Sequence, residues 1–200
     1  RLSLEILEEQ HKQENLMNNK QLPGRYSNLS ISLHWVMALL VFGLFAVGFW
    51  MVDLTYYSSW YKQAPDLHKS IGLCLLALML LRLLWRQLSP PPLPLASQSS
   101  AIQRTGKAVH LLLSVGLLAL MLSGYLISTA EGRGISVFGW FEVPASLTSI
   151  PDQEDFAGEV HFWLGWGVVV FAGLHALAAL KHHFIDRDAT LTRMLGRTER

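Results

Sequence analysis

The segment Val160–Leu180, VHFWLGWGVVVFAGLHALAAL, decides the fold of this chain. Its 21 residues include no aspartate, glutamate, lysine or arginine. At about 1.5 Å of rise per residue, a helix of this length crosses roughly 30 Å of hydrocarbon. The segment therefore predicts a membrane-spanning helix, and its two histidines, His161 and His175, would lie within the apolar layer.

Three further segments have the same character. Residues 26–52 and 108–130 contain no Asp, Glu, Lys or Arg, and residues 70–85 contain one arginine, Arg82, near the end of the run. A long arginine side chain near a helix end can reach the headgroups. With 51% hydrophobic and 16% charged residues, the chain is too apolar for an average soluble domain. We expect an all-α protein, a membrane four-helix bundle with up-and-down topology.

Breaker residues set the expected helix boundaries. Pro65 suits a first helical turn, and the run Ser89-Pro90-Pro91-Pro92 ends the second helix because proline has no amide donor. The longest connection, at about 130–156, contains apolar and acidic pieces that indicate a short helix or a hairpin. We expect helices at about residues 30–52, 65–88, 101 or 103 to 128, and 155–183.

The chain divides into three parts by composition. Residues 25–186 form the predicted four-helix transmembrane domain. Residues 1–24 are an N-terminal tail, which we expect to be partly foreign to the natural protein because it has no initiating methionine. Residues 187–200 read as a cytoplasmic tail with a short amphipathic surface helix.

Basic residues are distributed unevenly between the two sides of this bundle. The termini and the second connection share one side, which has thirteen of the sixteen lysines and arginines, against Lys62, Lys69 and Arg133 on the other. Cytoplasmic loops carry an excess of these residues. We therefore expect a multi-pass protein of the cytoplasmic membrane with both termini in the cytoplasm. Membrane topology explains the basic residues, and lipid rather than nucleic acid is the expected partner.

Four histidines fall at two depths of the predicted bundle. His34 and His175 lie near the inner ends of the first and fourth helices, and His68 and His161 near the outer ends of the second and fourth. Fourteen residues separate His161 from His175, so these rings lie within roughly 40° of one another around the helix and about 21 Å apart along it. The same spacing from His68 directs Arg82 into the bundle.

Paired imidazoles in hydrocarbon point to metal chemistry. An imidazole without a partner is costly there, and ligation of a metal or haem is its commonest use. Two six-coordinate haem irons would each need one imidazole above and one below. Zinc would need about four ligands at one site, whereas these histidines occur in twos. One cysteine, Cys74, and no C-x-x-C-H motif exclude covalent attachment, so two non-covalent haem groups are predicted.

His110 is the competing ligand at the inner level. It opens the third span three residues after Lys107, and it could replace His34 as the partner of His175. We rank it second because it lies at a shallower depth. Its alternative role is a hydrogen bond to a haem propionate or to a quinone.

Cations near the inner helix ends are candidate partners for haem propionates. Arg82 is the strongest of them, because it points inward and a guanidinium donates charge-assisted hydrogen bonds to carboxylates. Further candidates are Lys181, His182, His183 and, at the outer level, Lys69. For Lys181 and Lys69, contact with the lipid headgroups is at least as good an explanation. His182 and His183 follow the fourth span, and we expect them to be solvated.

Five segments carry a resemblance to a known family: RYSNLSISLHW, APDLHKSIG, LLRLLWRQLSPPP, HFWLGW and GLHALAALKHHFIDRDATLTRML. From about Arg25 to Leu195 the chain resembles the bacterial cytochrome b561 family, which is related to the cytochrome b subunits of hydrogenases and formate dehydrogenases. The resemblance implies an inner-membrane protein with two non-covalent haems b. It assigns His34 and His175 to the inner haem and His68 and His161 to the outer one, and Arg82 also matches a family position.

The resemblance implies electron transfer between a donor and a quinone, but it leaves three functions open. The first is an oxidoreductase that oxidises superoxide or another small donor and reduces ubiquinone. The second is a cytochrome b subunit or carrier that serves a separate periplasmic redox protein. The third is a haem-free transporter or scaffold. Eight acidic against three basic residues on the outer side predict weak electrostatic attraction of superoxide, and we assign no catalytic residue.

Overall fold

The computed structural model describes residues 25–148 and 150–197; the expected N-terminal tail at residues 1–24 lies outside them. Four long helices run up and down: α2 (Asn28–Met51), α3 (Gln63–Leu88), α4 (Ser100–Thr129) and α5 (Gln153–Phe184). All four are long and apolar enough to cross a membrane. The predicted all-α membrane four-helix bundle is confirmed, with helix ends close to the predicted ones.

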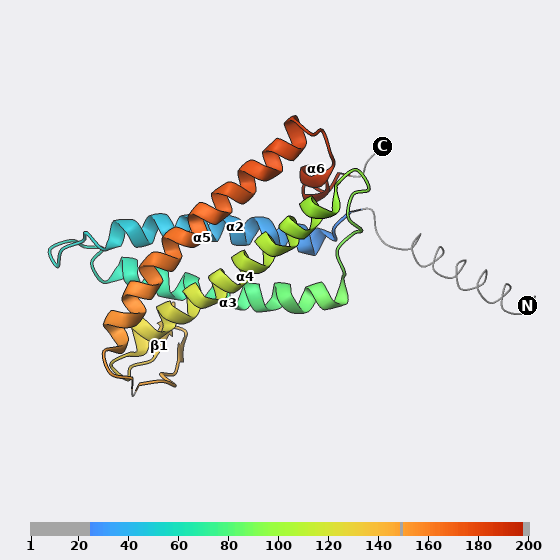
Figure 1. The fold of residues 1–200 in the computed structure, drawn as a ribbon. Helices are drawn as coiled ribbons and strands as arrows, with labels where there is room; N and C mark the ends of the chain where they lie inside the picture. The colour runs from blue at the N-terminus through green and yellow to red at the C-terminus, as the bar shows by residue number, and fades with distance from the viewer. Residues whose placement is uncertain (1–24, 149, 198–200) are drawn as a thin grey trace, which may run out of the picture.

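The helices form two pairs that cross at an angle. The α2 helix lies beside α3, α4 packs along α5, and the second pair runs diagonally across the first (Figure 1). Direct contacts between α2 and α5 are few. They include Trp166, whose ring meets Phe45 and Phe49 edge to face at centroid separations of 5.0 and 6.3 Å. Aromatic rings thus hold α2 against α5.

A small apolar core lies between the helices. It contains residues from all four: Met37, Leu75, Met79, Leu117 and Val168. A Cβ at Gly116 would lie 3.3 Å from Cγ2 of Val168, so this glycine allows α4 to approach α5 closely. Only 6 to 17% of the residues in the most apolar window of each helix are buried. The remaining apolar side chains face outward, which suits a chain whose solvent is lipid.

Side-chain caps and tryptophans fix the inner helix ends. Ser27 accepts a hydrogen bond from the Ser30 amide at 3.3 Å and so caps α2. The indole N–H of Trp85 donates to the same Ser27 hydroxyl at 3.0 Å, and that of Trp35 donates to the Met194 carbonyl at 2.9 Å. Met194 ends α6 (Thr190–Met194), a five-residue helix that is the helical part of the expected C-terminal tail.

The long outer connection contains a β-hairpin, one of the two structures expected there. Strand β1 (Ile135–Val137) pairs antiparallel with β2 (Phe141–Val143). The two turn residues, Phe138 and Gly139, have φ of 52° and 75°, as a tight hairpin turn requires. The buried Ser70 hydroxyl of α3 accepts from the Phe138 amide at 3.1 Å. The hairpin is thereby docked on the outer part of α3.

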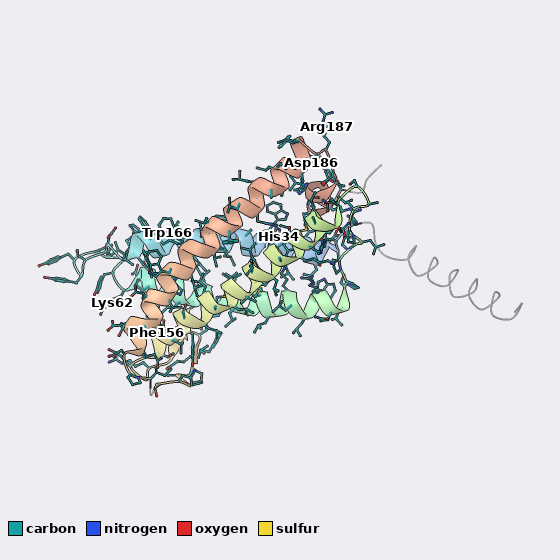
Figure 2. The ribbon with its side chains drawn as sticks, viewed as in Figure 1. His34, Lys62, Phe156, Trp166, Asp186 and Arg187 are labelled. Atoms are coloured by element: carbon teal, nitrogen blue, oxygen red, sulfur yellow. The ribbon has the colours of Figure 1, made fainter. Side chains whose placement is uncertain are left out.

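The two ends of the bundle carry different loops. Lys62 and Phe156 lie at one end, and Asp186 and Arg187 lie at the other (Figure 2). This grouping agrees with the two sides assigned from the sequence. Which side faces the cytoplasm remains a prediction.

Candidate histidine centres

The outer centre joins α3 to α5. The rings of His68 and His161 lie 6.3 Å apart between centroids, with their planes at 74°. Each ring packs against a glycine of another helix: a Cβ at Gly48 of α2 would lie 3.2 Å from Cε1 of His68, and one at Gly124 of α4 would lie 3.0 Å from Cε1 of His161. All four helices therefore shape this centre.

The two outer rings differ in their hydrogen bonds. Nδ1 of His161 lies 2.9 Å from the Leu120 carbonyl oxygen and 3.1 Å from the Ser123 hydroxyl. Nδ1 of His68 is buried and has no hydrogen-bond partner among the residues the structure describes. A buried nitrogen without a partner costs about 1–3 kcal/mol, so the His68 ring is of the kind that a bound group would stabilise.

The inner centre contains three histidines. The ring of His175 lies 6.3 Å from that of His34, with planes at 76°, and 5.1 Å from that of His110, with planes at 70°. His110 was expected to lie closer to the membrane surface than His34 and His175, but its ring lies at the same level as theirs. The α4 helix begins at Ser100, before the apolar run, and it packs along α5. This packing sets the depth of His110.

Arg82 points into the bundle, as its spacing from His68 predicted. Its Nη1 lies 3.3 Å from Nδ1 of His34. A guanidinium can only donate, so Nδ1 accepts in this arrangement and the neutral ring holds its proton on Nε2. If a metal took Nε2, the proton would move to Nδ1 and Arg82 would lose its acceptor. Arg82 would then be available to a carboxylate.

The spacing of the rings fits axial ligation of a haem. With about 2 Å for each metal–nitrogen bond and roughly 1 Å from that nitrogen to the ring centre, two axial imidazoles lie about 6 Å apart. The 6.3 Å separations of His34–His175 and His68–His161 fit this requirement, and the 5.1 Å of His110–His175 is shorter. Within residues 25–148 and 150–197, no three His, Cys, Asp or Glu side chains form a group able to hold an ion.

The inner end of α5 differs from the sequence prediction at His182, which was expected to be solvated. Its side chain is only 17% exposed, and Nδ1 lies 2.8 Å from Asp186 and 3.2 Å from Asp188. Lys181 also pairs with Asp186, at 2.7 Å. The turn after α5 folds back and places these carboxylates beside the helix, so the Lys181 and His182 side chains both lie against carboxylates of the chain itself.

Two residues of the outer centre were missed from the sequence, Ser123 and Gly124. Their only signal is a small, adjacent Ser-Gly pair inside an apolar helix, which more often indicates close helix packing. Their role becomes visible only when α5 places His161 against them.

The fold and the paired histidines define a class of protein: an integral membrane bundle whose facing imidazoles are spaced for haem, a membrane cytochrome b. The family model described as prokaryotic cytochrome b561 matches residues 25–197. The chain is also 53% identical over 182 residues to cytochrome b561 homolog 2 of Escherichia coli (strain K12), which covers 91% of this chain and 97% of that relative. The chain belongs to the prokaryotic cytochrome b561 family, as its sequence segments predicted.

More distant relatives cover nearly the same length. The probable superoxide oxidase CybB of Yersinia pestis is 30% identical over 176 residues, which cover 86% of this chain and 96% of that relative. Cytochrome b561 homolog 1 of Escherichia coli (strain K12) is 29% identical over 179 residues, covering 87% and 98%. With four membrane-spanning helices, the protein is a multi-pass inner-membrane protein, and its family implies electron transport and haem b.

Proposed function

We propose that this protein is a di-haem electron-transfer protein that passes electrons between a donor and the quinone pool. The observation that carries the proposal is the repeated ring separation of 6.3 Å, once in each centre, between histidines of different helices. Two independent pairs with one spacing are difficult to explain by helix packing alone.

The residues that would hold each haem follow from these distances. His34 and His175 would ligate the inner haem, and His68 and His161 the outer one. Haem b, when bound, supplies one-electron redox chemistry, and the protein tunes it through ligands, hydrogen bonds and burial. His110 lies too close to His175 for an iron between them, which favours a hydrogen-bonding role toward a propionate or quinone. Arg82, once released from His34, would pair with a propionate.

The route between the centres is built into α5. His161 and His175 lie on this one helix, about 21 Å of rise apart. The apolar core of Met37, Leu75, Met79, Leu117 and Val168 contains no charged side chain. These residues exclude water between the two levels, so charge would move between the centres rather than to solvent.

The outer surface bears on the choice of donor. Lys69 pairs with Asp66 at 2.8 Å, and Arg133 lies 3.6 Å from Glu131. Of the three outer cations, all within the described chain, only Lys62 has no acidic partner. Attraction of an anion such as superoxide is therefore weak. This observation favours the second candidate function, a cytochrome b that serves a separate periplasmic redox protein, although a relative at 30% identity is named a probable superoxide oxidase.

The haem count tests the proposal. We expect a pyridine haemochrome assay to give two haems per chain in the wild type, about one in His68→Ala and in His34→Ala, and two in His110→Ala. His183→Ala is the matched control, because this histidine belongs to neither centre and its ring packs against the neighbouring Phe184. If the wild type had no Soret band, both electron-transfer functions would be excluded, and the haem-free transporter or scaffold would be the remaining function. If His110→Ala retained one haem and His34→Ala retained two, His110 rather than His34 would be the inner haem ligand.

Stopped-flow reduction separates the two electron-transfer functions. Oxidised protein in nanodiscs is mixed with superoxide, or with a redox protein that co-purifies with it, and haem reduction is followed before and after ubiquinone is added. Rapid reduction by superoxide supports the oxidoreductase. Reduction by the protein partner alone supports the carrier.

A further inference from the structure

Ser123, Leu120 and His161 form a closed set of hydrogen bonds between α4 and α5. The Ser123 hydroxyl donates to the Leu120 carbonyl at 2.8 Å. Nδ1 of His161 lies 2.9 Å from the same carbonyl oxygen and 3.1 Å from the Ser123 hydroxyl oxygen. Ser123 is 5% exposed, so water does not compete effectively for these bonds.

The chemistry of these atoms fixes the tautomer of His161. A carbonyl oxygen has no proton, so Nδ1 must be the donor to Leu120. The single hydroxyl proton of Ser123 already points at Leu120, and its oxygen is left to accept from the same Nδ1–H. The proton therefore stays on Nδ1, and the lone pair stays on Nε2, the nitrogen available to a metal.

The opposite ring has no such support. Nδ1 of His68 has no hydrogen-bond partner among the residues the structure describes, and its ring is positioned by packing against Gly48. The two ligands of the outer centre would therefore differ as electron donors. An acceptor on Nδ1–H raises the basicity of a ligating imidazole, and only His161 has acceptors.

We propose that Ser123 is a positioning residue that, with the Leu120 carbonyl, orients His161 and lowers the reduction potential of the outer haem. The inference rests on the proposed function, because it takes His161 as an axial ligand. A more basic imidazole stabilises ferric over ferrous iron. His161, supported in this way, would therefore favour the oxidised state of a bound haem more than an unsupported histidine would.

The experiment is a spectroelectrochemical titration of the purified holoprotein, its Ser123→Ala and Ser123→Thr variants, and His161→Ala to identify the outer component. Ser123→Ala is expected to raise the midpoint of the outer component and leave the inner one unchanged. Ser123→Thr keeps the hydroxyl and is expected to restore the wild-type midpoint. The matched control is Ser128→Ala on the same helix, whose hydroxyl donates to the Gly124 carbonyl at 3.0 Å and has no hydrogen bond to a histidine of the described chain.

The outcomes separate this inference from the function on which it rests. An outer midpoint that is unchanged or lowered in Ser123→Ala, or a Ser123→Thr variant that behaves like Ser123→Ala, would overturn the role of the hydroxyl. If Ser123→Ala loses the outer haem and Ser123→Thr retains it, positioning is supported. Two other results would count against the proposed function instead. One is a wild type with fewer than two haems, and the other is a His161→Ala variant that retains both.

Discussion

At the level of single residues, the outer centre depends on two glycines, which have no side chain, as well as on its two histidines. Gly48 and Gly124 come from the two helices that contribute no histidine to this pair. Each leaves the space that an imidazole ring occupies. The Cβ of any other residue would press on the ring, and a metal ligand tolerates little displacement.

Gly124→Ala is predicted to lose the outer haem without loss of helix. Alanine is favoured over glycine by about 1 kcal/mol in a helix interior, so α4 itself is stabilised, but the new Cβ would lie 3.0 Å from Cε1 and 3.3 Å from Nδ1 of His161. Haem count and circular dichroism measure the two effects. The matched control is Gly106→Ala on the same helix, where nothing lies within 4 Å. If Gly124→Ala retained two haems, the His161 ring could shift away from the new Cβ without loss of the haem.

Arg82→Gln is predicted to lower the midpoint potential of the inner haem. A fixed positive charge favours the reduced iron, and its removal costs about 2 kcal/mol if it lies roughly 8 Å away at an effective dielectric constant near 20. A redox titration measures this change. Arg86→Gln, an exposed arginine on the same helix, is the control and should shift the midpoint much less. Equal shifts in both variants would mean that Arg82 does not face the inner haem.

At the level of elements, α5 supplies one histidine to each centre, and its inner end is held by a clasp of polar side chains. The clasp consists of Gln98, His182, Asp186, Asp188 and Thr190. Asp188 accepts from Gln98 Nε2 and from the Thr190 amide, both at 2.8 Å. It thereby joins the linker before α4 to the segment after α5, at the end of the bundle where Figure 2 shows Asp186.

The clasp is predicted to weaken in acid. Burial raises the pKa of the Asp188 carboxyl, but hydrogen bonds from Thr190 and Gln98, together with nearby His182, outweigh burial and hold that pKa below its ordinary 3.8. A lowered folded-state pKa stabilises the clasp above the unfolded value, and this stabilisation is lost as the pH falls through the folded value.

Asp188→Ala tests the clasp at neutral pH. The substitution is expected to cost about 1 kcal/mol locally, or roughly fivefold faster amide exchange in α6. The difference from wild type should shrink below about pH 4. Hydrogen exchange followed by mass spectrometry measures both, with the exposed Asp53→Ala of the outer loop as control. A difference that does not depend on pH would rule out the carboxylate as its source.

At the level of the whole molecule, the histidine pairs join helices that otherwise touch little. Both pairs connect a helix of the α2–α3 pair to α5, and direct contacts between α2 and α5 are few. The diagonal crossing of the two pairs is visible in Figure 1. Ligation in both centres would therefore also stabilise the packing of one helix pair on the other.

The orientation of the bundle is predicted from its basic residues, with both termini in the cytoplasm. Single cysteines in a Cys74→Ala background test it. In intact cells an impermeant maleimide should label Ser59→Cys, in the connection between α2 and α3, and leave Ser97→Cys, between α3 and α4, unlabelled until the membrane is opened. The opposite labelling would invert the topology and exchange the inner and outer centres.

Much of this protein could be read from its sequence. The four helices, their approximate ends, Arg82 pointing inward and the two histidine levels all follow from hydrophobic length and the 3.6-residue period, which are properties of one segment at a time. Two expectations do not hold in the structure: that His110 lies at a shallower depth than the other inner histidines, and that the His182 side chain is solvated. Both depend on where a second segment lies.

The sequence by itself determined that the chain crosses a membrane four times and carries imidazoles at two depths, because the cost of charge in hydrocarbon acts on each segment separately. Only the tertiary structure decided which rings face each other at 6.3 Å, which glycines make room for them, and which ring donates hydrogen bonds to Leu120 and Ser123. These features depend on contacts between helices far apart in the chain, and in lipid such contacts are selected by close packing and hydrogen bonding rather than by hydrophobicity.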